Sequence, residues 1–279
     1  MGDPSGLPGI LTVMVDGGAF EDCPDLAVGY IREPERIEIR YVTPAPSTKP
    51  SADTQQPEEE QEQEELAIPS TNSVTEREIV DAWGRIARWL HDNAPASHAA
   101  LRSGARQKAI DALEQNLDVP IPPALRALWL LTSGDNGVSG RGCLPGNQAL
   151  MTLEEVSAVY RFKMDAQANK DILNARRPEH DRFTLWKATW IPVVSLGPDD
   201  RSSGLYLDTA TGYLGRWSRY REAPDDELDT LVTYLEEVAD MLEAPDLAVR
   251  DKPGLIGDTL VWGSMLDTQQ EEHWQPFTG

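Results

Sequence analysis

The stretch SGARQKAIDALEQNLDVPIPPALRALWLLTSGDNGVSGRGCLPG, residues 103–146, decides the fold of this chain. Apolar residues recur in its first part at the spacing of an amphipathic helix, and a pair of prolines then opens a second, shorter helix. That helix ends at a polar, glycine-rich segment, which has the composition of a turn. The order predicts two packed helices leading into a loop. The residues that carry it are Ile110, Leu113, Glu114, Pro122, Trp129, Gly134 and Pro145.

Three strand-like segments follow at residues 190–196, 204–208 and 213–218. The connections between them are short and have the turn compositions GPDD and TATG. Parallel neighbours need a crossover of a dozen or more residues, so connections this short predict an antiparallel meander. A long amphipathic helix that ends near Leu242 should cover one face of the sheet. The sequence therefore predicts an α+β fold in which an antiparallel sheet packs against amphipathic helices.

Composition divides the chain into an N-terminal extension, a linker, a folded body and a C-terminal tail. The linker is rich in proline and glutamate; such a chain stays extended and cannot bury a core, so we expect it to be disordered. A solvated helix through its run of glutamates is the alternative. Apolar and alternating runs predict strands at 10–15 and 36–41 in the extension, and one added strand near 255–262 in the tail. In chain order the four parts cover residues 1–43, 44–73, 74–243 and 244–279.

Two capping boxes indicate helix starts in the folded body. Thr75 and Glu78 have the spacing at which a threonine and a glutamate satisfy each other's free backbone N–H groups, so a helix is predicted to start at Thr75. Thr152 and Glu155 repeat the pattern and predict another helix. The polar residues 169–182 show no apolar periodicity, and we expect them to form a loop.

The net charge of −22 lies mostly outside the predicted body. Sixteen acidic and four basic residues fall in residues 1–76, so this part alone carries −12. Such acidity opposes binding to nucleic acid or to an anionic membrane, and it favours fast encounter with a basic partner. A solvated acidic tail is the plainer alternative.

The cysteine pattern and the N-terminus indicate a cytoplasmic protein. The two cysteines, Cys23 and Cys143, have no CxxC spacing and give no disulfide framework, which suits a reducing compartment. The N-terminus lacks the basic region of a signal peptide, and no stretch is long and apolar enough for a membrane helix. The sequence does not determine an oligomeric state.

The side chains that bond-breaking chemistry requires are scattered. His91, His98, His180 and His273 have no metal-binding spacing. The chain also lacks the HExxH, GxSxG and GxxxxGK[ST] motifs. We therefore predict that the protein is not an enzyme, with no catalytic residues, no cofactor and no metal.

Taken in order, these motifs resemble the SUKH superfamily, the group of Knr/Smi-type cell-wall regulators and bacterial immunity proteins, over residues of about 76–243. Two departures are Ile121, where leucine is common in the family, and the longer polar segment at 169–182. The resemblance implies a non-catalytic α+β domain. Bacterial members often look like immunity proteins that bind and neutralise a toxin domain, and fungal relatives act as regulatory scaffolds. Outside residues 103–146, the resemblance rests mainly on Trp83, Trp190, Pro192 and Asp208.

Four polar residues are candidates for contact with a partner. Asp135 and Asn136 lie in the glycine loop at 134–142, and Asp199 and Asp200 lie in the turn at 197–203. Their acidic groups would meet basic side chains of the partner. Simple turn formation is the alternative for all four.

The tryptophans divide into two groups. Trp83, Trp129 and Trp190 fall on apolar faces and are expected in the core. Trp186 and Trp217 flank charged residues, so an exposed contact with a partner is more plausible for these two, with core packing as the alternative. Asp208 ends a strand, and capping of the following turn is its ordinary explanation.

These observations lead to a protein-binding function. The leading hypothesis is an immunity-type protein that neutralises a toxin, such as a nuclease with basic substrate-binding residues, by stoichiometric binding. The alternative is a regulatory or scaffold module that binds a client protein through the N-terminal extension and linker. The sequence identifies neither the partner nor the binding face.

Overall fold

The computed structural model describes residues 3–4, 11–15, 26–32, 37–44, 71–218, 227–248, 251–266 and 268–278. Contacts divide the chain into two units, Met1–Glu65 and Leu66–Gly279. Of the predicted linker at 44–73, residues 45–70 lie outside the described residues, and so does Cys23.

The first unit contains one antiparallel sheet with the strand order β1-β2-β3-β4. Two of its strands correspond to the ones expected at 10–15 and 36–41, and a further strand lies between them. The register between the third strand and the fourth shifts between Gly29 and Tyr30, where the sheet has a bulge or irregularity. The strands are β1 (Asp3–Pro4), β2 (Leu11–Val15), β3 (Leu26–Arg32) and β4 (Ile37–Pro44).

The second unit is built around a five-stranded antiparallel sheet with the order β5-β6-β7-β8-β9. The predicted meander is confirmed, since its three central strands pair in chain order through short turns. Their bounds are β5 (Ala149–Leu150), β6 (Trp190–Ser195), β7 (Ser203–Asp208), β8 (Tyr213–Ser218) and β9 (Glu227–Thr230).

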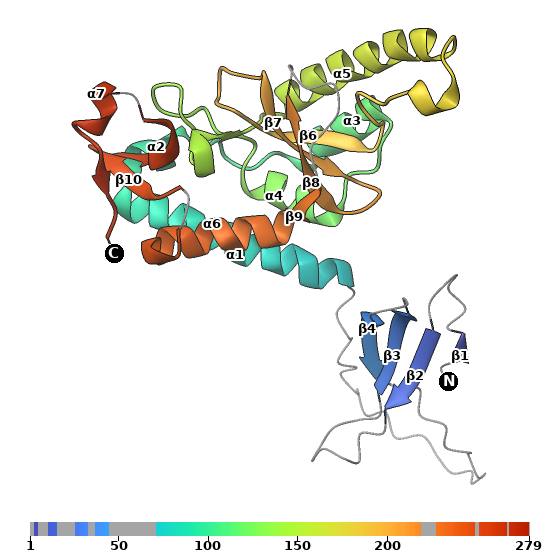
Figure 1. Ribbon diagram of the computed structural model, residues 1–279. Helices are drawn as coiled ribbons and strands as arrows, with labels where there is room; N and C mark the ends of the chain where they lie inside the picture. The colour runs from blue at the N-terminus through green and yellow to red at the C-terminus, as the bar shows by residue number, and fades with distance from the viewer. Residues whose placement is uncertain are drawn as a thin grey trace. The chain divides into compact units, whose positions relative to one another are not determined.

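Helices cover both faces of this sheet (Figure 1). One layer contains α1, α4 and α6, which contact one another, and α5 lies across the opposite face beside α3. The α+β architecture is therefore the one predicted. The helices are α1 (Thr71–Asn93), α2 (Pro95–Ala100), α3 (Gln107–Leu117), α4 (Pro123–Leu131), α5 (Leu153–Asn174), α6 (Leu231–Glu243) and α7 (Thr268–Glu271).

Glu114 joins α3 to α4. Its Oε1 accepts the Ile121 N–H at 2.7 Å, and its Oε2 lies 2.8 Å from Arg126 Nη2. The same guanidinium reaches Asp111, so one arginine of α4 holds two carboxylates of α3. The hydrogen bond from Ile121 and the nearby guanidinium lower the pKa of Glu114 below its usual value. Glu114 thus has a structural role, because its carboxylate binds both the backbone N–H just before the proline pair and the arginine of the following helix.

The tail after α6 forms a second, three-stranded sheet with the order β11-β10-β12. One strand was expected near 255–262, and the chain forms a hairpin there, with a left-handed Gly257 (φ 57°) in its turn. Trp262 is fully buried, and its indole N–H donates to the Cys143 carbonyl at 3.0 Å. The tail is thereby fastened to the body. Its strands are β10 (Pro253–Ile256), β11 (Thr259–Trp262) and β12 (Gln275–Pro276).

Two expected helix boundaries were wrong. Helix α1 begins at Thr71, so Thr75 lies inside it and does not cap it. Helix α5 continues to Asn174, into the segment 169–182 that was expected to be a loop. The capping box of Thr152 and Glu155 at the start of α5 is confirmed.

Asp208 connects the ends of β6 and β7. Its Oδ2 accepts the Trp190 indole N–H at 2.9 Å, and its Oδ1 accepts the Ala210 N–H in the following turn. Burial alone would raise the pKa of Asp208, but hydrogen bonds from Ala210, Thr189 and Trp190 outweigh burial and hold this pKa below its usual value. The ionised carboxylate is therefore the form that stabilises the fold.

We expect Asp208→Asn to lower the free energy of unfolding by about 1–3 kcal/mol at neutral pH, because one buried N–H loses its acceptor. A depressed folded-state pKa adds stability above the unfolded value of about 3.9, and this contribution is lost as the pH falls through the folded-state pKa. The difference between wild type and variant should therefore shrink on acidification below about pH 4 in urea unfolding experiments. A difference that stays constant down to the acid limit would contradict this role.

Candidate protein-binding surface

The two loops predicted to face a partner lie side by side. A Cβ atom added to Gly137 would come within 2.3 Å of Pro198 Cγ, and one added to Gly197 within 2.8 Å of the Gly140 carbonyl oxygen. Pairing of β5 with β6 brings these loops together, because the first loop leads into β5 and the second follows β6. We call residues 134–142 and 197–203 the paired-loop surface.

Asp135 shapes the first of these loops and is not an exposed contact residue. Its side chain is 3% exposed, and its two oxygens accept the N–H groups of Gly137 at 2.7 Å and Cys143 at 2.8 Å. Burial raises the pKa of Asp135, although these two N–H donors oppose the rise. The expected partner contact through Asp135 is thus replaced by a structural role, because its carboxylate satisfies backbone groups that no strand pairs.

Three of the four polar candidates are exposed on the paired-loop surface. Asn136, Asp199 and Asp200 are exposed, and Asp200 also accepts the Ser202 N–H at 2.9 Å. Arg201 in the same loop forms an ion pair with Glu155 at the start of α5. The ion pair therefore fixes the second loop to the start of α5, while Asp199 and Asp200 of this loop are exposed to solvent.

The two tryptophans proposed as exposed contacts are buried instead. Trp186 is 1% and Trp217 is 5% exposed. Trp186 lies edge-on to Trp217, Trp190 and Tyr206, with ring centroids 5.4–6.3 Å apart. The interpretation failed because adjacent residues of a strand point to opposite faces, so the charged Arg216 can be exposed while its neighbour Trp217 packs under α5.

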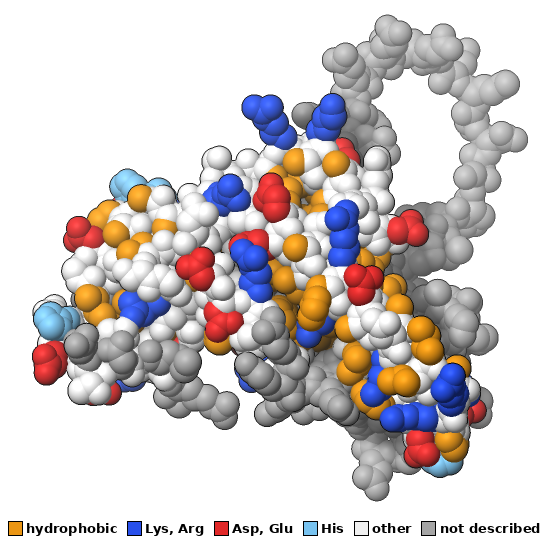
Figure 2. Space-filling view, turned by 90° about the horizontal axis from the view of Figure 1, so that it is seen from above, with side chains coloured by type: hydrophobic (Ala, Val, Ile, Leu, Met, Phe, Trp, Pro, Cys, Tyr) orange, Lys and Arg blue, Asp and Glu red, His pale blue; other side chains and the backbone are white. Residues whose placement is uncertain are grey.

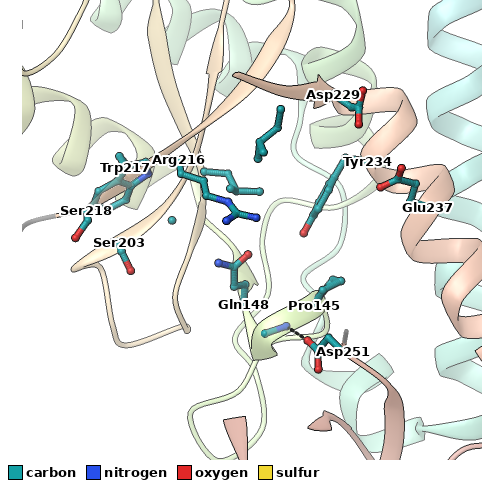
Figure 3. Close-up of a pocket in the computed structure, with 14 residues that line it drawn as sticks. Pro145, Gln148, Ser203, Arg216, Trp217, Ser218, Asp229, Tyr234, Glu237 and Asp251 are labelled. Carbon is teal, nitrogen blue, oxygen red and sulfur yellow. Dashed lines mark hydrogen bonds between the residues drawn. The ribbon is translucent and has the colours of Figure 1, made fainter. Parts of the chain in front are cut away.

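An open hollow of about 610 Å³ lies where β7, β8 and α6 meet residues 145–148 (Figure 3). Figure 3 shows Arg216, Gln148 and the Tyr234 hydroxyl turned toward its centre. The Tyr234 hydroxyl is buried and has no hydrogen-bond partner among the described residues, and burial raises its pKa. Three carboxylates, from Asp229, Glu237 and Asp251, also line the hollow, and histidine and cysteine are absent from its described lining.

Helix α5 exposes large apolar side chains that the sequence interpretation missed. Phe162 is 59%, Ile172 is 64% and Leu173 is 54% exposed. Figure 2 shows apolar and basic side chains gathered at the projecting end of α5, on the right of the view. The sequence predicts the start of this helix, but its outer part has no apolar periodicity, so the exposed side chains there were not identified.

No cluster of three or more His, Cys, Asp and Glu side chains that could hold a metal ion occurs among the described residues. None of the described helices combines the length and apolar character that a membrane span requires.

Comparison with known families gives a match to part of the chain. The model of the SMI1 / KNR4 family (SUKH-1) matches residues 104–244, from just before α3 to just after α6. The match includes the central sheet and the paired-loop surface, while α1 with Trp83 precedes it. Comparison with curated proteins gave no match.

We expect Asp135→Ala to lower the free energy of unfolding by about 1–3 kcal/mol, because two N–H groups lose their acceptor. Asp199→Ala in the neighbouring loop is the matched control and should change it by no more than about 0.5 kcal/mol, since its side chain is exposed. Urea unfolding of the two variants measures the difference. Equal losses would show that Asp135 does not organise the loop.

Two tyrosines allow a matched test of the unpartnered hydroxyl in the hollow. Tyr160 donates to the Ala188 carbonyl at 2.8 Å, so Tyr160→Phe should cost about 1 kcal/mol. Tyr234→Phe should leave the free energy of unfolding unchanged or raise it slightly, because a buried hydroxyl without a partner is destabilising. Chemical denaturation compares the two. A loss at Tyr234 as large as that at Tyr160 would reveal a partner for its hydroxyl.

Proposed function

The chain belongs to the SMI1 / KNR4 (SUKH-1) family, and from this membership we propose that it is an immunity-type protein that neutralises a toxin domain by stoichiometric binding. The family includes immunity proteins, and this membership is the observation that carries the proposal. The protein acts without catalysis of its own, as a binding partner that covers the active site of the toxin.

The paired-loop surface is the proposed contact face. Asp199 and Asp200 are exposed there, while Arg201 is already paired with Glu155. Aspartates on a firmly held loop lose little conformational entropy when they bind, which favours affinity. Their charge fits a toxin whose substrate site is basic, such as a nuclease, because complementary charge speeds the encounter.

Co-expression tests this function. The toxin domain encoded beside this chain should arrest growth when expressed alone, and the intact chain should restore growth and form a one-to-one complex in light scattering. Asp199→Lys with Asp200→Lys should weaken the complex by about tenfold or more, because it places like charges together. A matched reversal on α1, Glu78→Lys with Asp81→Lys, changes the net charge equally at exposed positions and should have little effect.

Three results would count against the proposal. They are a neighbouring protein that is not toxic, a toxic neighbour that forms no complex with the chain, and equal loss of affinity in both charge reversals. Equal loss of affinity in both charge reversals would still be compatible with a toxin complex, but it would show that the paired-loop surface is not the contact face.

A regulatory scaffold remains the second candidate function, because residues Met1–Glu65 form a unit with its own sheet. A neutralising protein does not require such a unit. The co-expression experiment separates the two functions when repeated with a chain that starts at Leu66. Unchanged protection supports neutralisation by the second unit, whereas loss of partner binding supports tethering through the first.

A further inference from the structure

The end of α5 and the segment that returns from it form one preassembled element, the α5 hairpin, residues 162–187. Gln167 Oε1 accepts the N–H groups of Leu185 at 2.6 Å and Trp186 at 3.0 Å. Farther out, Asn174 Nδ2 donates to the Phe183 carbonyl at 2.9 Å. In Figure 1 this element extends past the edge of the central sheet. Its shape is thus fixed by hydrogen bonds before any partner arrives.

The α5 hairpin exposes apolar side chains on one side. Phe162 and Leu173 are eleven positions apart, which returns to the same face of an α-helix about 16 Å farther along. Ile172 flanks Leu173, and all three are more than half exposed. Single exposed apolar residues are ordinary, but several on one projecting element indicate an interaction site.

The α5 hairpin is basic although the chain is strongly acidic. Residues 162–187 hold six Lys and Arg residues against four Asp and Glu, whereas the whole chain has 25 against 47. Within the described residues, Lys170, Arg176 and Arg177 form no ion pair with a carboxylate. Lys170 instead lies over the Phe183 ring, 3.4 Å from its centroid. Arg177 lies farther from the same ring, 5.8 Å from its centroid. The guanidinium groups of Arg176 and Arg177 are therefore available to carboxylates of another molecule.

We propose that the α5 hairpin docks an acidic segment of another protein that carries apolar side chains. Carboxylates of that segment pair with Arg176 and Arg177, whose planar guanidinium groups suit bidentate contact. Its apolar side chains cover Ile172 and Leu173. Because the hairpin is preassembled, little entropy is lost in ordering it.

Charge and side-chain type favour a protein over other partners. Single-stranded nucleic acid is bound through cations together with several exposed aromatic rings on which bases stack, but in this hairpin Ile172 and Leu173 are aliphatic, Phe183 is covered by Lys170, and Phe162 is the one strongly exposed Phe, Tyr or Trp ring. Phe162 borders Arg201 of the paired-loop surface, but Ile172, Leu173, Arg176 and Arg177 are not part of that surface, so the inference does not depend on a toxin partner.

The test uses the full chain and a labelled short peptide in which glutamate and leucine follow an amphipathic helical pattern. Fluorescence anisotropy should show binding that weakens as salt is added, because charge contributes to it. Ile172→Ser with Leu173→Ser, and separately Arg176→Glu with Arg177→Glu, should each weaken binding about tenfold or more. The same peptide with lysine in place of glutamate should not bind.

Matched variants on α1 serve as controls. Val80→Ser removes another exposed apolar side chain, and Arg77→Glu with Arg88→Glu reverses the same amount of charge at exposed positions. Both should bind the acidic peptide as the wild type does. Equal weakening by these controls, absence of binding, or tighter binding to single-stranded RNA or to phosphatidylserine vesicles would overturn the proposal.

Discussion

Buried backbone N–H groups must find acceptors, and at two glycine-containing turns of this protein a buried carboxylate provides them. Asp135 accepts from the N–H groups of Gly137 and Cys143, and Asp208 accepts from Ala210. Asp208 also holds the Trp190 indole, which ties the aromatic cluster to the same turn. The shape of the paired-loop surface and the alignment of the central strands both depend on these two acids.

The fold could largely be predicted, because its signals are local. Helical periodicity around Ile110 and Leu113 and the short turns of the meander each need only neighbouring residues to interpret. The outer half of α5 could not be predicted in this way. Its residues form helix without burying an apolar face, so the sequence lacks the periodicity that marked the other helices. The first proline after α5 is Pro178, which is consistent with the end of the helix at Asn174.

The candidate surface was predicted only in part, because exposure depends on contacts between distant segments. The neighbourhood of the two loops follows from the pairing of β5 with β6, yet the burial of Asp135 depends on how the chain closes around it. Trp186 and Trp217 illustrate the same limit. Charged neighbours suggested exposure, but Trp186 and Trp217 pack under α5 in the aromatic cluster.

Cys143 directly follows the first loop, and the fold buries its thiol. Its N–H is held by Asp135, its side chain is 2% exposed, and burial raises the pKa of its thiol well above the usual value. The thiolate is the form that attacks thiol reagents, so a sulfur that stays protonated and buried is protected in the folded protein. Alkylation of Cys143 would therefore require a local opening that exposes its thiol to solvent. The alkylation rate would then measure how often this opening occurs.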